Sequence, residues 1–196
     1  MPHEHISFLK AALEYDPDNI EDLIRLGWLC DDDCHDYDTA IRYLTKATQL
    51  PRHNAEAYFW LAKVYFHNGY VPEARAALTQ ALSLDDAHVP SLSLLVSVHC
   101  DMHAPQDAEP IVQRALALRP SWLAIVLNAC YVYAMLGQRV REEHYARRAL
   151  AMAHSYARVS TPETYSYYEA AITGRWISRE QLSRLRTQYR TVLRDA

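Results

Sequence analysis

The chain has 196 residues, of which 50% are hydrophobic and only four are glycine. This composition excludes a disordered chain and gives enough apolar residues for a domain with a buried core. The shortage of glycine turns, together with abundant alanine, leucine and arginine, favours an all-α fold over a β-sheet. The formal net charge of −4 argues against a nucleic-acid-binding protein.

The charge is unevenly spread along the sequence. Residues 1–38 carry 11 acidic and 2 basic residues, whereas residues 139–196 carry 6 acidic and 11 basic residues. The opening "MPHEHISFLKAAL" has no positive region followed by an apolar run, so we expect no secretion signal, reduced thiols and a cytoplasmic protein. The longest mainly apolar stretch, residues 122–136, is short for a membrane span. We therefore expect no membrane insertion.

Residues 1–19 precede a repeat that runs through most of the chain. Segments beginning at Ala55, Val89 and Leu123 are spaced by 34 residues, and an earlier copy beginning at Ile20 is one residue longer. This period predicts four repeats, residues 20–54, 55–88, 89–122 and 123–156. The fragment "HISFLKAALEYDPDN" matches the second half of a repeat, which predicts an orphan helix at residues 1–19.

Small and large apolar residues recur at fixed places within these repeats. Examples are Leu26, Leu61 and Leu95 in the first half and Ala40, Ala74 and Ala108 in the second, although only the first copy has the pair Leu26-Gly27. Apolar residues three and four apart face one side of a helix, and small residues let two helices approach closely. Each half-repeat is therefore predicted to be one helix of an antiparallel pair, and each pair must stack on its neighbours to bury its second face.

This pattern is similar to the tetratricopeptide (TPR) repeat, with Leu26-Gly27, the alanines above and the prolines Pro17 and Pro120 at matching positions. The tryptophan that the family places early in its first helix is absent from all four copies. The resemblance implies a right-handed superhelical solenoid of antiparallel helix pairs. It also implies a protein–protein interaction module with no enzymatic activity and no cofactor.

Residues 157–196 depart from the repeat. Thr161 and Gly174 suit the beginning and end of one helix, and Ser178 with Gln181 has the spacing of a capping box for another. We interpret these segments as two capping helices that close the array; the alternative is a basic docking helix, because several arginines flank the second apolar stripe.

The resemblance further implies a concave groove lined by the first helix of each repeat, in which a partner peptide or helix would bind. The residues carried over to this groove are Ile24, Trp28, Phe59, Lys63, Phe66, His67, Ser93, Ser97, Leu127, Tyr131 and Met135. Such a groove would be aromatic and mostly uncharged, and Lys63 alone is too little for a clamp on a carboxylate terminus. The alternative is that these aromatic residues belong to the core between repeats.

The stretch "CDDDCH" (residues 30–35) admits several interpretations. Cys30 and Cys34 are four residues apart and could begin a metal site, but two ligands alone do not complete one. We predict that Asp31, Asp32 and Asp33 form an acidic rim for a basic partner rather than a metal site, with a plain solvated turn as the alternative. Asp36 or Asp38 is expected to cap the following helix.

No phosphate-binding or catalytic motif occurs in the sequence. We therefore predict an adaptor that binds a protein or peptide partner. A more specific version is a bacterial cytosolic chaperone or assembly factor for a secretion or surface apparatus. The alternatives are a homo-oligomeric scaffold assembled head to tail through its oppositely charged ends and, third, a metal-dependent hydrolase using the Cys/His clusters.

Overall fold

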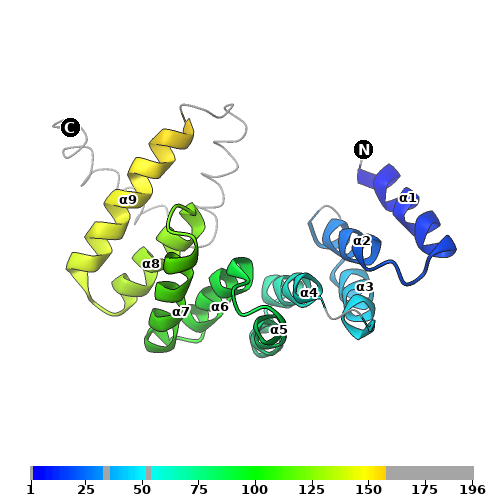
Figure 1. Ribbon diagram of the computed structural model, residues 1–196, viewed down its shortest axis with the longest axis horizontal. Coiled ribbons are helices and arrows are strands. Elements are labelled where there is room, and N and C mark those ends of the chain that lie inside the picture. The colour runs from blue at the N-terminus through cyan, green and yellow to red at the C-terminus, as the bar shows by residue number, and fades with distance from the viewer. Residues whose placement is uncertain (1, 33–35, 52–53, 158–196) are drawn as a thin grey trace. The chain divides into compact units, whose positions relative to one another are not determined.

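The computed structural model describes residues 2–32, 36–51 and 54–157, and every element in these ranges is an α-helix (Figure 1). The all-α prediction is thus confirmed. The chain divides into two compact units, Met1–Ala104 and Pro105–Ala196. The helices of the first unit are α1 (Pro2–Tyr15), α2 (Ile20–Asp32), α3 (Tyr37–Gln49), α4 (Ala55–His67), α5 (Val71–Leu84) and α6 (Val89–Asp101). Those described in the second unit are α7 (Pro105–Leu118), α8 (Leu123–Met135) and α9 (Arg139–Ala157). The capping helices predicted beyond residue 157 lie outside the described residues.

Short polar side chains begin three of the helices. The Oδ1 atoms of Asn19, Asp36 and Asn54 accept hydrogen bonds from backbone N–H groups in the first turns of α2, α3 and α4. These bonds satisfy donors that a helix start leaves without intrahelical partners. Of the two aspartates expected to cap α3, Asp36 does so. After α4 the chain turns at Gly69, whose positive φ of 81° suits glycine.

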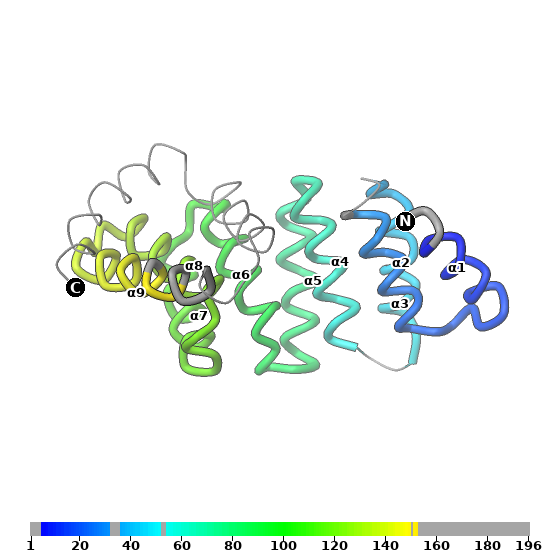
Figure 2. Tube along the Cα trace, turned by 90° about the horizontal axis from the view of Figure 1, so that it is seen from above, coloured from blue at the N-terminus to red at the C-terminus, as the bar shows by residue number. Residues whose placement is uncertain are grey.

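In the first unit, successive helices pack in antiparallel pairs joined by short turns. Helix α2 packs on α3, and α4 packs on α5, beside which it runs in Figure 2. Contacts also join α3 to α4, α2 to α4 and α4 to α6. The last two contacts place the first helices of neighbouring pairs next to one another, so that α2, α4 and α6 form one layer of the unit.

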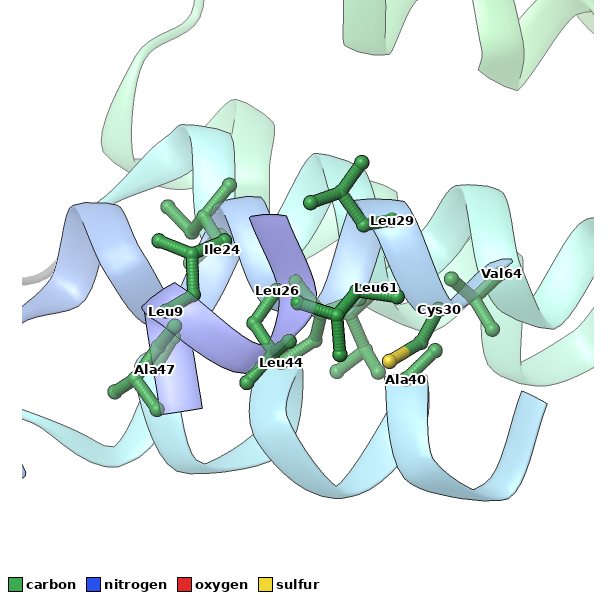
Figure 3. Close-up of a cluster of buried hydrophobic side chains, with 13 residues drawn as sticks. Leu9, Ile24, Leu26, Leu29, Cys30, Ala40, Leu44, Ala47, Leu61 and Val64 are labelled. Atoms are coloured by element: carbon green, nitrogen blue, oxygen red, sulfur yellow. The ribbon is translucent and has the colours of Figure 1, made fainter. Parts of the chain in front are cut away.

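The core of the first unit is built from the repeated apolar positions (Figure 3). Leu26 of α2 and Leu44 of α3 are fully buried, and Leu61 and Val64 reach the same cluster from α4. Leu9 joins it from α1, so this helix buries one apolar stripe against the array. Burial of each large aliphatic side chain stabilises the fold by roughly 1.5–3 kcal/mol.

The second unit packs α8 against both α7 and α9. Val126 of α8 and Ala149 of α9 are buried together, and the buried ring of Tyr133 stacks on Tyr145 of α9 with centroids 5.4 Å apart. Within the described part of the chain, no helix has the length and apolar character needed to cross a membrane.

Two turns that contain a proline, at Pro17 and Pro120, are each bonded to a basic side chain of a later helix. Lys46 donates to the carbonyl of Pro17 in the first unit, 29 residues away, and Arg148 donates to that of Pro120 in the second, 28 residues away. The separations differ by one residue, which agrees with the single extra residue of the repeat that begins at Ile20. The same hydrogen bond, from a basic side chain to a proline carbonyl, therefore occurs at the same place in two repeats, with lysine in one and arginine in the other.

Candidate functional site

The first unit carries an aromatic strip, which we define as Trp28 of α2, Phe59 and Trp60 of α4, and His88 just before α6. The indole centroids of Trp28 and Trp60 lie 6.0 Å apart with their planes tilted by 53°. Phe59 meets the ring of Trp60 edge-on at 5.3 Å and that of His88 at 5.6 Å. The Trp28 residue is 37% exposed, so the strip presents aromatic surface to solvent.

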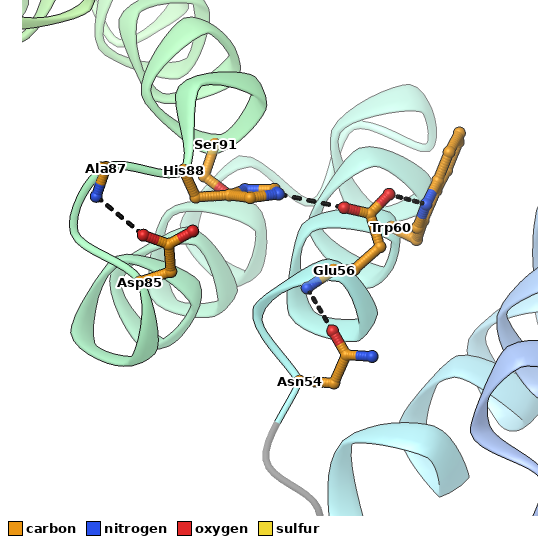
Figure 4. A network of polar contacts seen from close by, with 7 residues as sticks. All are labelled: Asn54, Glu56, Trp60, Asp85, Ala87, His88 and Ser91. Atoms are coloured by element: carbon orange, nitrogen blue, oxygen red, sulfur yellow. Dashed lines mark hydrogen bonds and ion pairs between the residues drawn. The ribbon is translucent and has the colours of Figure 1, made fainter. Parts of the chain in front are cut away.

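The carboxylate of Glu56 holds part of this strip in place (Figure 4). Its Oε1 accepts a hydrogen bond of 2.7 Å from the indole Nε1 of Trp60, and its Oε2 accepts one of 3.0 Å from Nε2 of His88. The other ring nitrogen of His88 lies 2.7 Å from the hydroxyl of Ser91. The hydrogen bond from His88 is the main cause that lowers the pKa of Glu56, against the opposing effect of partial burial. Glu56 therefore links α4 to the start of α6.

Lys63 lies one turn after Trp60 and covers its ring. The ammonium Nζ is 4.5 Å from the centroid of Trp60, which is the geometry of a cation–π contact. The strip thus already accommodates one cation on an indole face.

A second contact between α2 and α4 corrects the expectation of an exposed acidic rim. Asp31 is only 2% exposed, and its Oδ2 lies 3.0 Å from Nδ1 of His67. Because α2 continues to Asp32, the side chain of Asp31 still points toward α4 instead of into a turn. An exposed rim is therefore wrong for Asp31. The side chain of Asp32 and the whole of Asp33 lie outside what the structure describes.

The other predicted groove residues are distributed between surface and core. Ile24, Phe66 and Ser97 are buried, so we place them in the core rather than on a surface that a partner could reach. Ser93 is partly buried and its carbonyl accepts a hydrogen bond from Ser97. Leu127, Tyr131 and Met135 of α8 are partly buried and belong to the second unit.

Two members of the strip, Trp60 and His88, were not predicted from the sequence. Trp60 directly follows Phe59, which was predicted from its repeat position. The large aromatic side chain of Trp60 was the signal that could have identified it as a site residue. His88 is the last residue of the repeat 55–88, just before α6, where the repeat pattern assigns no side chain a role, so no sequence signal pointed to it.

The sequence also has two histidines four residues apart, His99 and His103. In the described part of the chain, no group of three or more histidine, cysteine, aspartate or glutamate residues is close enough to hold a metal ion. Cys30 is buried in the core, and Cys34 lies outside the described residues. Cys100 and Cys130 are also buried, and burial raises the pKa of each thiol to about 12. Such thiols are poor nucleophiles and poor metal ligands.

A cleft of about 860 Å³ lies where α2 and α4 begin. We call it the acidic cleft, because four carboxylates and two asparagines are among its lining residues, namely Asp16, Asp18, Glu21, Asp85, Asn19 and Asn54. Asp18 pairs with Lys46 at 3.1 Å. Glu21 belongs both to this cleft and to the first turn of α2. Glu56, which bonds two residues of the aromatic strip, occupies the first turn of α4.

Helix pairs that recur every 34 or 35 residues and pack first helix to first helix are the arrangement of tetratricopeptide-like repeat proteins, and this chain has that TPR-like repeat fold. Residues 33–115 match the family model described as anaphase-promoting complex, cyclosome, subunit 3. A comparison with curated protein sequences gave no match.

Several solved structures resemble the chain in fold, and some of them are described as TPR proteins. A crystal structure of MamA is 25% identical with a TM-score of 0.67, and the match covers 78% of this chain and 89% of MamA. PilW, described as a widely conserved type IV pilus biogenesis factor, is 18% identical with a TM-score of 0.66, covering 73% of this chain and 66% of PilW. YrrB, described as a TPR protein with an unusual peptide-binding site, is 21% identical with a TM-score of 0.63, covering 82% and 84%.

Proposed function

We propose that the protein binds a segment of a partner protein, as an extended peptide or a helix, on the aromatic strip of its first unit. The observation that carries the proposal is the pairing of Trp28 and Trp60 across two neighbouring helices, with Trp28 partly exposed to solvent. Tryptophan supplies a large contact area at a small cost in side-chain entropy, which is why it is frequent at the centres of interfaces.

The contacts around Trp60 hold its ring in one orientation. Its indole donates a hydrogen bond to Glu56, Lys63 lies over the ring, and the partly buried side chain packs against the core. Side chains that are rigid before binding lose less conformational entropy when a partner docks. The strip is therefore preorganised for contact with another molecule.

Affinity capture from the native source, followed by mass spectrometry, tests the proposal. The bait is the full chain, compared with the double variant Trp28→Ala/Phe59→Ala and with Trp122→Ala. Trp122 is a matched control because it is 39% exposed but belongs to the second unit. We expect the wild type and Trp122→Ala to recover the same partner, and the double variant to lose it while keeping its circular dichroism spectrum. Recovery of that partner by the folded double variant would refute the proposal.

A more specific role is an adaptor or cytosolic chaperone that helps to assemble a bacterial secretion or surface apparatus. The likeness to PilW, whose description names pilus biogenesis, supports this version. The same capture experiment tests it: the partner lost by the double variant should be a component of such an apparatus. A captured partner from an unrelated pathway would contradict this role and leave the binding site unaffected.

A further inference from the structure

We infer that the segment bound by the aromatic strip is basic, and that one of its arginine or lysine side chains stacks on Trp28 while others face Glu56, Glu21 and the acidic cleft. This inference rests on the proposed function above, because it specifies the chemistry of the partner at the same site.

The strip already shows how it holds a cation. Lys63 places its ammonium 4.5 Å from the ring centroid of Trp60, and the indole N–H of Trp60 is bonded to the Glu56 carboxylate. An aromatic face beside a carboxylate is a favourable environment for arginine or lysine, since the ring contributes a cation–π attraction and the carboxylate an ion pair. Trp28 lies 6.0 Å from Trp60 and is the more accessible of the two indoles. A second cation, supplied by a partner, would find an aromatic face at Trp28, next to the indole that is bonded to the Glu56 carboxylate.

Carboxylates border the strip toward the beginnings of α2 and α4. The Glu56 side chain is 44% exposed although both its oxygens accept hydrogen bonds. Glu21 is exposed on α2, seven residues before Trp28, so that both lie on one side of the helix. Glu21 also lines the acidic cleft. A bound segment that stacks on Trp28 and extends toward the first turns of α2 and α4 would therefore pass the carboxylates of Glu56, Glu21 and the acidic cleft.

The charge of the whole first unit points the same way. Residues 1–104 contain 16 acidic and 7 basic residues, a net charge of −9. Such a field attracts basic partners and raises their rate of association at low ionic strength. Electrostatic complementarity thus favours a basic occupant over an acidic or purely apolar one.

Two basic residues, Arg25 of α2 and Lys63 of α4, lie near the strip and oppose this excess of negative charge. Lys63 is directed at the ring of Trp60. Arg25 is exposed one turn after Glu21, at the spacing of a helical ion pair. Both are already counted in the net charge of −9, so the first unit remains acidic with them included.

Fluorescence polarisation with three labelled peptides tests the inference. The peptides share one frame of leucine residues and differ only in carrying arginine, glutamine or glutamate at the intervening positions. At low salt we expect the arginine peptide to bind about tenfold or more tighter than the glutamine peptide, and the glutamate peptide to bind weakest. The affinity of the arginine peptide should fall as salt is added, because exposed charges are screened. Equal or tighter binding of the glutamine or glutamate peptide would overturn the inference.

Variants show whether the arginine peptide occupies the proposed site. Trp28→Ala and Glu56→Gln should each weaken its binding by about fivefold or more. Trp122→Ala and Glu73→Gln make the same chemical changes at exposed positions elsewhere and should leave it unchanged. Glu56→Gln keeps an oxygen acceptor for Trp60, so it remains informative if Trp28→Ala perturbs folding. Binding of the arginine peptide that is insensitive to both site variants would also overturn the inference.

The outcome can be separated from that of the proposed function. If the Trp28→Ala/Phe59→Ala variant loses the native partner while the three peptides bind alike, the strip is a binding site whose partner is not selected by positive charge. In that case the inference fails and the proposed function stands.

Discussion

Gly27 of α2 lies directly against the side chain of Leu44 of α3. A Cβ atom added at Gly27 would be 2.5 Å from Cγ of Leu44 and 2.9 Å from its Cδ2. Both residues are buried, and Leu44 is fully enclosed. The absence of a side chain at Gly27 therefore sets how closely the first helix pair can pack.

Replacing Gly27 with alanine should destabilise the protein. In an open helix this change would stabilise by up to about 1 kcal/mol, because alanine has the higher helix propensity. Here the added methyl group must displace Leu44, and overpacking of this kind costs typically about 1–3 kcal/mol. We expect the clash to outweigh the propensity, so that urea denaturation followed by circular dichroism shows a net loss of stability.

The leucine side chain provides the control for this prediction. Leu44→Ala alone should cost about 2–5 kcal/mol, because it leaves a cavity in the core. In that background, Gly27→Ala fills space that is now empty and should be neutral or stabilising. Additive losses in the double variant would show that the two residues do not limit each other's packing.

Asp31 and His67 should contribute more to stability than an exposed ion pair of the same unit. The Asp31 side chain is 1% exposed, whereas those of Lys46 and Asp18 are 43% and 68% exposed. We expect Asp31→Ala to lower the free energy of unfolding by about 1–3 kcal/mol, since it removes the buried carboxylate that lies 3.0 Å from the partly buried imidazole of His67. Asp18→Ala should cost less than about 1 kcal/mol. Equal effects in chemical denaturation would contradict the role given to Asp31.

Glu56 should make stability depend on pH in the acidic range. Its pKa is lowered in the folded protein from an ordinary value of 4.5, chiefly by the hydrogen bond from His88. A lowered pKa stabilises the fold above about pH 4.5, and this contribution is lost as the pH falls through the folded pKa. Melting temperatures measured between neutral pH and about pH 3 should therefore fall less steeply for Glu56→Gln than for the wild type. Glu73→Gln, at an exposed position, should follow the wild type; identical profiles for all three proteins would refute the assignment.

Cys100 and Cys130 should resist alkylation in the folded protein. Burial raises the pKa of each thiol from 9.0 to about 12, so that very little thiolate is present at pH 8. Iodoacetamide treatment followed by peptide mass spectrometry should leave both sites unmodified, and addition of denaturant should make both react. Rapid labelling of either cysteine under native conditions would show that its surroundings are open.

Much of the fold could be predicted from the sequence because the packing of each repeat requires small or apolar residues at fixed positions. Leucine recurs at one position of the first helix (Leu26, Leu61 and Leu95) and alanine at one position of the second (Ala40, Ala74 and Ala108), and the structure buries all six. The beginning of α3 was also predictable, because capping by Asp36 is a local interaction. Periodicity and capping act over a few residues and are therefore visible in one sequence.

The site was predicted less completely because it depends on contacts between distant residues. Trp28 and Phe59 were selected by their repeat positions, but the contact of His88 with Glu56 joins residues 32 apart, and no periodic pattern specifies it. Asp31 looked like part of an exposed acidic turn because it begins a run of three aspartates. Its partner His67 is 36 residues away, and only the packing of α2 on α4 shows that the carboxylate is buried.

Hydrogen exchange followed by mass spectrometry, with the captured partner added to the purified full chain, tests the central claim most directly. A bound segment shields backbone amides and suppresses local opening where it docks. We predict slower exchange in peptides from α2 and α4, which carry Trp28, Phe59 and Trp60. When the same partner is added to the variant Trp28→Ala/Phe59→Ala, exchange in these peptides should not change. Protection confined to α8 and α9, with α2 and α4 unchanged, would contradict the assignment of the binding site to the aromatic strip.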